Sequence, residues 1–137
     1  MTHTYQGKCL CGQAQYEVHG PFLAFHICHC SQCRRSTGSA HASNIFTEKE
    51  NIKWLAGEDL VKRYDPEEPG VISKAFCTNC GSLMPYISSK NGKLIIPAGS
   101  LSEDPGVRPD DNIFWENRAE WYDSVPEAPR FDGFPKK

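Results

Sequence analysis

The stretch Cys28-His29-Cys30-Ser31-Gln32-Cys33 places three sulfurs within six residues. Core packing rarely produces such a cluster, although a free cysteine often behaves as a small buried hydrophobic residue. Four further cysteines form two pairs on either side of this stretch, Cys9 with Cys11 and Cys77 with Cys80. Thiolates two or three residues apart can converge on one soft metal ion, and zinc is the usual occupant of an all-sulfur site. The sequence therefore predicts a domain that is stabilised by bound zinc.

Disulfides explain the same cysteines less well. An odd count of seven leaves one thiol unpaired in any disulfide scheme. Residues 1–7 are polar and open no apolar run typical of a secretory signal, so a cytoplasmic location is the default prediction. Thiols in that compartment are kept reduced, which favours metal binding.

Length and composition restrict the class of protein further. The 137 residues fit one domain, with 39% hydrophobic and 23% charged residues, which is typical of a globular chain. Lysine and arginine number 15 against 17 acidic residues, so there is no basic excess to bind nucleic acid. No apolar stretch approaches the roughly 18 residues of a membrane span, and a soluble protein is expected.

Ligand counting suggests two different sites. A closed structural zinc site takes four protein ligands, whereas a reactive site keeps three and leaves a position for water or substrate. Seven cysteines can divide as the two outer pairs plus the middle triplet. Cys30 and Cys33 can equally join Cys77 and Cys80 in a zinc ribbon, and spacing alone does not decide between these partitions.

The rest of the chain indicates an all-β fold with little helix. Short alternating or β-branched runs are bounded by Gly, Pro, Asn or Ser. These runs are Ala14–Val18, Phe22–Cys28, Ala42–Phe46, Leu60–Tyr64, Val71–Phe76, Leu83–Ile87 and Lys93–Ala98. Asn91-Gly92 predicts a hairpin between the last two, because both residues accept a positive φ.

One short helix and a tail complete the prediction. The helix is expected over Ser31–Thr37, capped by Ser31 and stopped by Gly38. From Pro126 onward, three prolines predict an irregular tail. The predicted organisation is one domain over 1–125 and a tail over 126–137.

Three blocks of residues resemble a known family. The blocks are Gly7-Lys8-Cys9-Leu10-Cys11-Gly12, then Cys28-His29-Cys30-Ser31-Gln32-Cys33-Arg34-Arg35-Ser36-Thr37-Gly38, then Phe76-Cys77-Thr78-Asn79-Cys80-Gly81. In order and spacing they are similar to the glutathione-dependent formaldehyde-activating enzyme family, also called the GFA or CENP-V domain. The similarity covers roughly residues 5 to 123, and the aromatic segment Trp115–Asp123 also resembles one in that family.

This resemblance implies a fold and a partition of the cysteines. It implies an Mss4-like, folded β-sheet domain with two zinc ions. The structural zinc would be bound by Cys9, Cys11, Cys77 and Cys80. The catalytic zinc would be bound by Cys28, Cys30 and Cys33, with one position open.

The open site favours sulfur chemistry. Three thiolates outweigh one Zn²⁺, so the triplet site carries a formal charge of −1 and lowers the pKa of a bound water less than neutral imidazoles do. A soft, sulfur-rich zinc suits an incoming thiol, which it holds as thiolate. Together with the resemblance, this predicts a carbon-sulfur lyase that adds glutathione or a similar thiol to a small aldehyde such as formaldehyde.

Several neighbouring side chains are candidates for the same site. Arg34 and Arg35 can receive the carboxylates of a glutathione-like molecule or simply offset the charge of the sulfurs. Alternation along the triplet predicts that His29 points away from the metal, and His26 and His41 are expected to be structural or surface residues. The aromatic residues Phe114, Trp115, Trp121 and Tyr122 are expected to pack in the core.

Two other classes of function remain open at this stage. A zinc-stabilised interaction module would use the same fold without catalysis, since fold does not fix function. A thiol redox enzyme of the methionine sulfoxide reductase type would use one free cysteine of low pKa as nucleophile. The sequence predicts neither the oligomeric state nor the acid-base residue.

Overall fold

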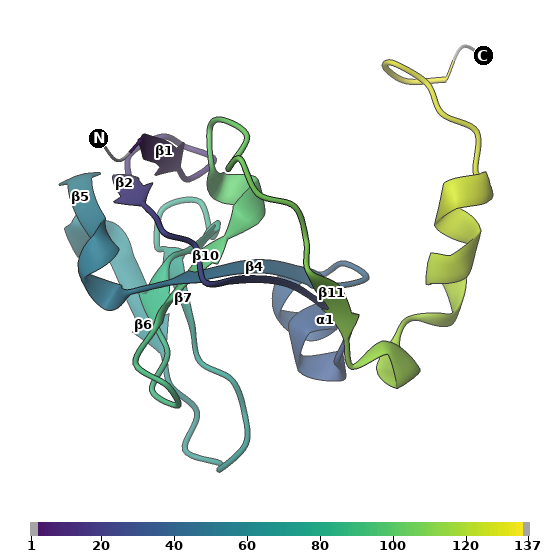
Figure 1. The fold of residues 1–137 in the computed structure, drawn as a ribbon, viewed down its shortest axis with the longest axis horizontal. Coiled ribbons are helices and arrows are strands. Elements are labelled where there is room, and N and C mark those ends of the chain that lie inside the picture. Colours follow the sequence, from purple (N-terminus) through teal and green to yellow (C-terminus); the bar gives the residue numbers. More distant parts are fainter. Residues whose placement is uncertain (1–2, 136–137) are drawn as a thin grey trace.

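The computed structural model describes residues 3–135, which form strands in three sheets (Figure 1). The first sheet has the order β1-β2-β5. Its strands are β1 (Thr4–Lys8), β2 (Gln15–His19) and β5 (Ile52–Ala56). The second sheet has the order β11-β3-β4-β10-β9. Its strands are β11 (Asp111–Ile113), β3 (Ala24–Cys28), β4 (Ala42–Thr47), β10 (Leu94–Pro97) and β9 (Tyr86–Ile87).

The third sheet has the order β6-β7-β8. Its strands are β6 (Val61–Tyr64), β7 (Lys74–Cys77) and β8 (Leu83–Met84). The α-helix α1 (Ser31–Thr37) follows β3. Short 3-10 helices are η1 (Lys49–Asn51), η2 (Glu58–Leu60), η3 (Ala98–Ser100), η4 (Trp115–Asn117) and η5 (Glu120–Glu127). The predicted all-β class with little helix is therefore confirmed, but the sequence patterns missed β1, β5 and β11.

The helix α1 begins with a cysteine as its cap. The N-cap is Cys30, whose Sγ accepts a hydrogen bond from the Cys33 amide at 3.3 Å. The prediction of Ser31 as the cap was wrong, because Ser31 is already the first helical residue. Gly38 ends the helix as predicted, in the left-handed conformation at φ 67°, with its N–H donating to the Arg34 carbonyl.

The hairpin predicted around Asn91-Gly92 is present as β9 and β10. These strands pair antiparallel, with Ile87 opposite Leu94. The connection is longer than the two-residue turn that the dipeptide suggests, since it runs over residues 88–93. Of Asn91 and Gly92, only Gly92 has a positive φ, at 71°. The resulting loop is long enough to form part of a pocket wall.

The larger of two apolar clusters connects the sheets, and the smaller one surrounds Cys28, Cys33 and Ala42. In the larger cluster, the largest fully buried side chains come from β2, β4, β8 and β10. They are Tyr16, Val18, Ile45, Met84, Leu94 and Ile96. The Tyr16 hydroxyl, buried among them, is hydrogen-bonded to Ser100 Oγ at 2.5 Å. The core fixes the ends of the strands from which the cysteines project.

The chain after β11 leaves the sheets. In Figure 1 the yellow-green helix η5 and the residues after it stand apart from the three sheets. The helix η5 continues to Glu127 with Pro126 inside it, so the tail predicted to start at Pro126 is irregular only after this helix. Within residues 3–135, no helix has the length and apolar character needed to cross a membrane.

Candidate metal centres

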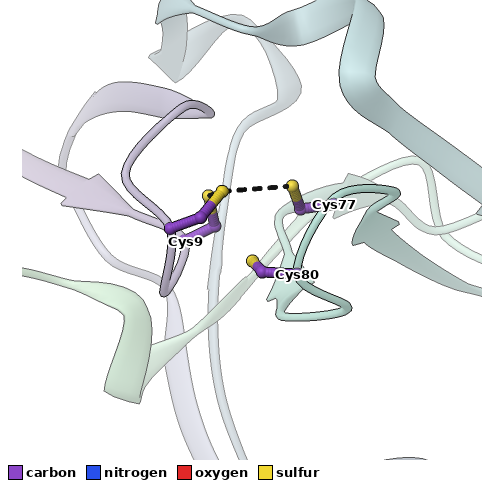
Figure 2. A group of neighbouring side chains, drawn as sticks. Cys9, Cys77 and Cys80 are labelled. Carbon is purple, nitrogen blue, oxygen red and sulfur yellow. Dashed lines mark hydrogen bonds between the residues drawn. The ribbon is translucent and has the colours of Figure 1, made fainter.

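Four cysteines from two distant loops meet beside the first sheet. Cys9 and Cys11 follow β1, while Cys77 ends β7 and Cys80 lies in the turn after it. Their sulfurs all lie within 4.8 Å of one another. The Cys9 and Cys11 sulfurs are 3.5 Å apart, and the Cys11 and Cys77 sulfurs are 3.9 Å apart. Figure 2 shows the sulfurs of Cys9, Cys77 and Cys80 turned toward a common centre.

These sulfur-sulfur distances fit the tetrahedral coordination of one metal ion. A zinc-sulfur bond of about 2.3 Å requires sulfurs about 3.8 Å apart in a tetrahedron. All seven cysteines are free thiols rather than disulfides. The four sulfurs around Cys9 are therefore able to hold one zinc with every position filled by protein, as the resemblance implies.

Hydrogen bonds lower the pKa of two cysteines in this group and so favour their thiolate forms. Hydrogen bonds from the Ser82 side chain and amide, and from the Cys11 amide, lower the pKa of Cys80 to about 5. Burial alone would raise the pKa of Cys9, but hydrogen bonds from the Ala14 amide and the neighbouring thiols outweigh it and lower the pKa. The Ala14 amide lies 3.3 Å from the Cys9 sulfur. Thiolates are the form that binds a metal.

The other three cysteines meet at the junction of β3 and α1. Cys28 is the last residue of β3, Cys30 caps the helix, and Cys33 lies in its first turn. Their sulfurs lie within 4.8 Å of one another, and Cys28 and Cys33 are buried. Among residues 3–135, no histidine, aspartate or glutamate joins this group as a fourth ligand. The zinc-ribbon pairing of Cys30 and Cys33 with the Cys77 pair is not the arrangement of the structure.

The electrostatics of the triplet favour a cation between the sulfurs. Burial raises the pKa of Cys33, and the adjacent Cys28 and Cys30 raise it further. Burial also raises the pKa of Cys28. At Cys30 the hydrogen bond from the Cys33 amide and the other thiols outweigh burial and lower the pKa. Three such close sulfurs can all be thiolates only around a positive charge, and a soft divalent ion fits them.

A hollow of about 380 Å³ opens onto the triplet. All three cysteines of the triplet line it. The other four cysteines, which we call the Cys9 group, do not; they are Cys9, Cys11, Cys77 and Cys80. The apolar walls of the hollow come from β4, β10 and the residues around 70 and 114. Its polar rim is the loop over residues 88–91, which includes Lys90. A molecule much larger than water can therefore reach the three sulfurs.

Two polar side chains line this hollow although the sequence did not place them there: His26 was expected to be a structural or surface residue, and no role was predicted for Tyr86. His26 lies two residues before Cys28 on β3, so both side chains face the same side of the strand. Its Nδ1 is 2.6 Å from the Asp111 carboxylate on the parallel neighbour β11. Tyr86 of β9 also lines the hollow. The alternation of β3 could have placed His26, but nothing in the sequence pattern predicted β11 or its carboxylate.

A smaller hollow of about 200 Å³ lies beside the first one. It shares Cys33 and Tyr86 with the larger hollow, and His41 lines it. Burial lowers the pKa of His41, and the charge of His29 lowers it further. His41 is therefore near the triplet but does not line the hollow that all three sulfurs share.

His29 points away from the triplet, as alternation predicts. It is fully buried, and its Nε2 lies 3.0 Å from Asn112 Oδ1. The rings of Trp115 and Tyr122 pack against it at centroid distances of 5.0 and 4.9 Å. His29 therefore anchors the chain after β11 to the back of the triplet.

None of the four aromatic residues predicted to pack in the core is buried, so that prediction is wrong: Trp115 is 41% exposed and Tyr122 is half-buried. Trp115 and Tyr122 pack on His29. Phe114 is 58% exposed and lines the larger hollow, and Trp121 is 58% exposed as well. The segment lies outside the core because the chain turns away from the sheets at Phe114, which has a positive φ of 53°.

Arg34 and Arg35 lie outside the hollow of the triplet. They line a separate hollow of about 300 Å³ with Ser31 and Ser39 on the outer side of α1. The geometry does not bring them to the three sulfurs, so it gives no support to the hypothesis that they bind the carboxylates of a thiol there. The cationic side chain that does line the larger hollow is Lys90.

Comparisons with known proteins agree with this arrangement. The chain is similar to a Rhodobacter sphaeroides protein of known crystal structure, with 22% sequence identity and a TM-score of 0.60. That similarity covers 78% of this chain and 98% of the other, and it supports the fold. Residues 4–117 match the family model described as glutathione-dependent formaldehyde-activating enzyme, and this range includes both cysteine groups. The chain therefore belongs to the GFA family.

Proposed function

We propose that this protein is a carbon-sulfur lyase that joins a small-molecule thiol to a small aldehyde. The observation that carries the proposal is the difference between the two cysteine groups. Four sulfurs close the Cys9 group, whereas three sulfurs form the other group and face a hollow of about 380 Å³. A site with three protein ligands and an open side is typical of catalytic rather than structural zinc.

Zinc is the ion that best fits both groups, and at the triplet it would supply Lewis acidity that keeps an incoming thiol in its thiolate form. Cys28, Cys30 and Cys33 would hold it there. The electron-rich sulfurs disfavour hydrolysis by a metal-activated water, so a thiol is the expected substrate. Glutathione is the first candidate because of the family to which the chain belongs.

The rim of the hollow suits a thiol that carries a carboxylate. Lys90 supplies a positive charge, and Ser88, Ser89 and Asn91 supply hydrogen-bonding groups on the same loop. Apolar side chains that line the same hollow, such as Ile95 and Phe114, would limit the access of water to the reacting atoms. This arrangement would orient a thiol with its sulfur toward the triplet and its charged end toward the loop.

The addition forms one carbon-sulfur bond and converts the carbonyl group into an alcohol. The thiolate sulfur attacks the carbonyl carbon, the C=O π bond breaks, and the oxygen takes up a proton to give an S-hydroxymethyl thioether. Negative charge develops on that oxygen before the proton arrives. A hydrogen-bond donor aimed at it would stabilise the transition state.

Tyr86 is the candidate for this donor. Burial raises its pKa, the nearby Cys33 sulfur raises it further, and Arg63 lowers it by less, so the hydroxyl is protonated at neutral pH. The guanidinium of Arg63 lies 5.5 Å from the centre of the Tyr86 ring. Arg63 is itself held by Asp65, whose carboxylate oxygens accept from its Nε at 2.9 and 2.8 Å. The ring is thereby held in place at the wall of the hollow.

Replacing Tyr86 by phenylalanine is expected to lower kcat by about 10²-fold, because the loss of one donor to a developing oxyanion has roughly that effect. The ring remains, so zinc content and the circular dichroism spectrum should not change. Steady-state rates with saturating thiol and aldehyde measure the effect. Tyr64→Phe is the matched control, since Tyr64 is exposed and lines neither hollow at the triplet. An unchanged kcat in Tyr86→Phe would remove this residue from the mechanism.

The proposed function itself is tested by exchange NMR with the zinc-loaded protein, glutathione and formaldehyde. We expect exchange between free formaldehyde and the adduct to be faster than in the same mixture without protein. No acceleration with glutathione or with any of a panel of thiols would refute the lyase and favour a zinc-stabilised interaction module. Alkylation of the zinc-loaded protein addresses the redox alternative, which requires one fast-reacting thiol among the seven.

A further inference from the structure

The smaller hollow beside the triplet has no part in the proposed function so far. Its volume is about 200 Å³. It adjoins the larger hollow at residues that line both of them, and these are Cys33, Asn44, Ile72, Ser73 and Tyr86. One of the three sulfurs and the candidate donor to the reacting oxygen therefore lie where the two hollows meet.

The walls that belong to the smaller hollow alone are apolar or already paired. The hydroxyls of Ser36 and Thr37 both donate to the Cys33 carbonyl, at 3.2 and 2.7 Å. The Ser43 Oγ lies 3.3 Å from His41 Nδ1. Apolar atoms supply much of the remaining wall, from Ala42, Ala75, Leu83, Met84, Pro97 and Ala98. A ligand therefore gains more here from burying carbon atoms than from new polar contacts.

The smaller hollow also offers little to an ionic group. Of the residues from 3 to 135, no aspartate or glutamate lines it. Burial lowers the pKa of His41, so its imidazole is uncharged at neutral pH. The ammonium of Lys74 lies 5.9 Å from the centre of the Phe76 ring, and Phe76 lines a different hollow. The group that fits this space is therefore uncharged and apolar.

Formaldehyde does not use this space, because its carbonyl carbon carries no substituent. An apolar cavity of about 150 Å³ is large enough to hold a benzene molecule. The smaller hollow, at about 200 Å³, can therefore receive an alkyl group of up to about six carbon atoms. The larger hollow, at about 380 Å³, remains for the thiol.

We propose that the smaller hollow binds the substituent of the aldehyde, so that the carbonyl substrates include aliphatic aldehydes of about three to six carbon atoms. This inference rests on the proposed function. The carbonyl group would lie where the hollows meet, with its oxygen toward Tyr86 and its alkyl chain in the smaller hollow. The thiol sulfur bonds to the carbonyl carbon, the C=O π bond breaks, and the thiol proton ends on the oxygen. The product is an S-(1-hydroxyalkyl) thioether.

Exchange NMR with glutathione and a series of aldehydes tests the substrate class. The measured quantity is the acceleration, which is the exchange rate with zinc-loaded protein divided by the rate without protein for the same aldehyde below saturation. We expect the acceleration to rise about fourfold for each methylene added from ethanal to butanal, because burying one methylene group favours binding by roughly that factor.

Two substitutions that fill the smaller hollow test where the alkyl chain lies. Ala75→Val and Ala98→Leu each add carbon atoms at a residue that lines the smaller hollow and not the larger one. Each should lower the ratio of the butanal acceleration to the formaldehyde acceleration by about tenfold or more, the effect of one methylene too many in an apolar pocket. Ala56→Leu is the matched control, since Ala56 is exposed on β5 and lines neither hollow. Zinc content and circular dichroism check that each variant is folded.

The methionines allow binding to be observed without turnover. Met84 is fully buried and lines the smaller hollow, and the chain contains only one other methionine, Met1. Butan-1-ol has the alkyl chain of butanal but cannot undergo the addition. In protein labelled with ¹³C at the methionine methyl groups, it should shift the Met84 signal and show a nuclear Overhauser effect to that methyl group. Ala98→Leu should abolish both effects.

The outcomes separate this inference from the proposed function. Acceleration of formaldehyde exchange with no rise along the aldehyde series would overturn the inference and leave the lyase intact. An unchanged ratio in both filling variants, or no effect of butan-1-ol on Met84, would overturn it in the same way. No acceleration with any aldehyde would refute the lyase and, with it, the assignment of this hollow to a substrate.

Discussion

Replacing Cys77 by serine is expected to leave the chain largely unfolded at room temperature, even with zinc in the buffer. Cys77 is fully buried at the end of β7, and its group ties the turn over residues 77–80 to the loop after β1. A structural zinc contributes about 10–16 kcal/mol in small zinc-binding domains. The total stability of a domain is only about 5–15 kcal/mol. Losing even part of the zinc affinity should therefore exceed what the core can supply.

Far-UV circular dichroism, a thermal melt and zinc analysis measure this effect. The parent chain is expected to bind two zinc ions and to melt cooperatively. Asn79→Ala is the matched control, because Asn79 is an exposed residue of the same turn and is not part of the cysteine group. A Cys77→Ser chain that melts within a few degrees of the parent would show that the fold does not depend on zinc binding by the Cys9 group.

The cysteine sites could be foreseen to different degrees from the sequence. Cys28, Cys30 and Cys33 are neighbours along the chain, so their spacing alone brings the three sulfurs together. The four-sulfur group joins residues about 70 positions apart, and spacing left a zinc ribbon equally open. The resemblance to a family was needed to choose between these pairings, because local pattern contains no information on which loops meet.

The walls of the larger hollow were less predictable. β11 has only three residues and no apolar alternation, and it pairs with β3 because the chain returns to that edge of the sheet after about 80 residues. This return brings Asp111 to His26 and Phe114 to the mouth of the hollow. No pattern in the segment 111–114 indicates such a return.

The positions of the two arginines after the triplet were also hard to predict from the sequence. Arg34 and Arg35 are adjacent to Cys33 in sequence, but successive residues of a helix point about 100° apart. Cys33 faces the core, so the next two side chains turn to the outer side of α1. Closeness to Cys33 in sequence therefore does not by itself bring these two side chains to the hollow of the triplet.

Replacing Cys33 by serine is expected to abolish the proposed lyase activity while leaving the domain folded. Cys33 lies at the meeting point of the two hollows, and its loss leaves only two sulfurs for the ion of the triplet. A catalytic metal is worth several kcal/mol in the transition state, so the rate should fall by about 10³-fold or more. The Cys9 group is untouched, and the melting temperature should stay close to that of the parent.

Native mass spectrometry distinguishes this result from general damage. The Cys33→Ser chain should retain one zinc ion, whereas the parent retains two. Ser36→Ala is the matched control, because Ser36 follows one turn later on α1 and lines the smaller hollow without offering a sulfur. Retention of both ions in Cys33→Ser would contradict an open three-sulfur site. Loss of one ion with unchanged thiol-aldehyde exchange would show instead that the triplet binds metal but does not carry the reaction, which is the outcome expected of a zinc-stabilised interaction module.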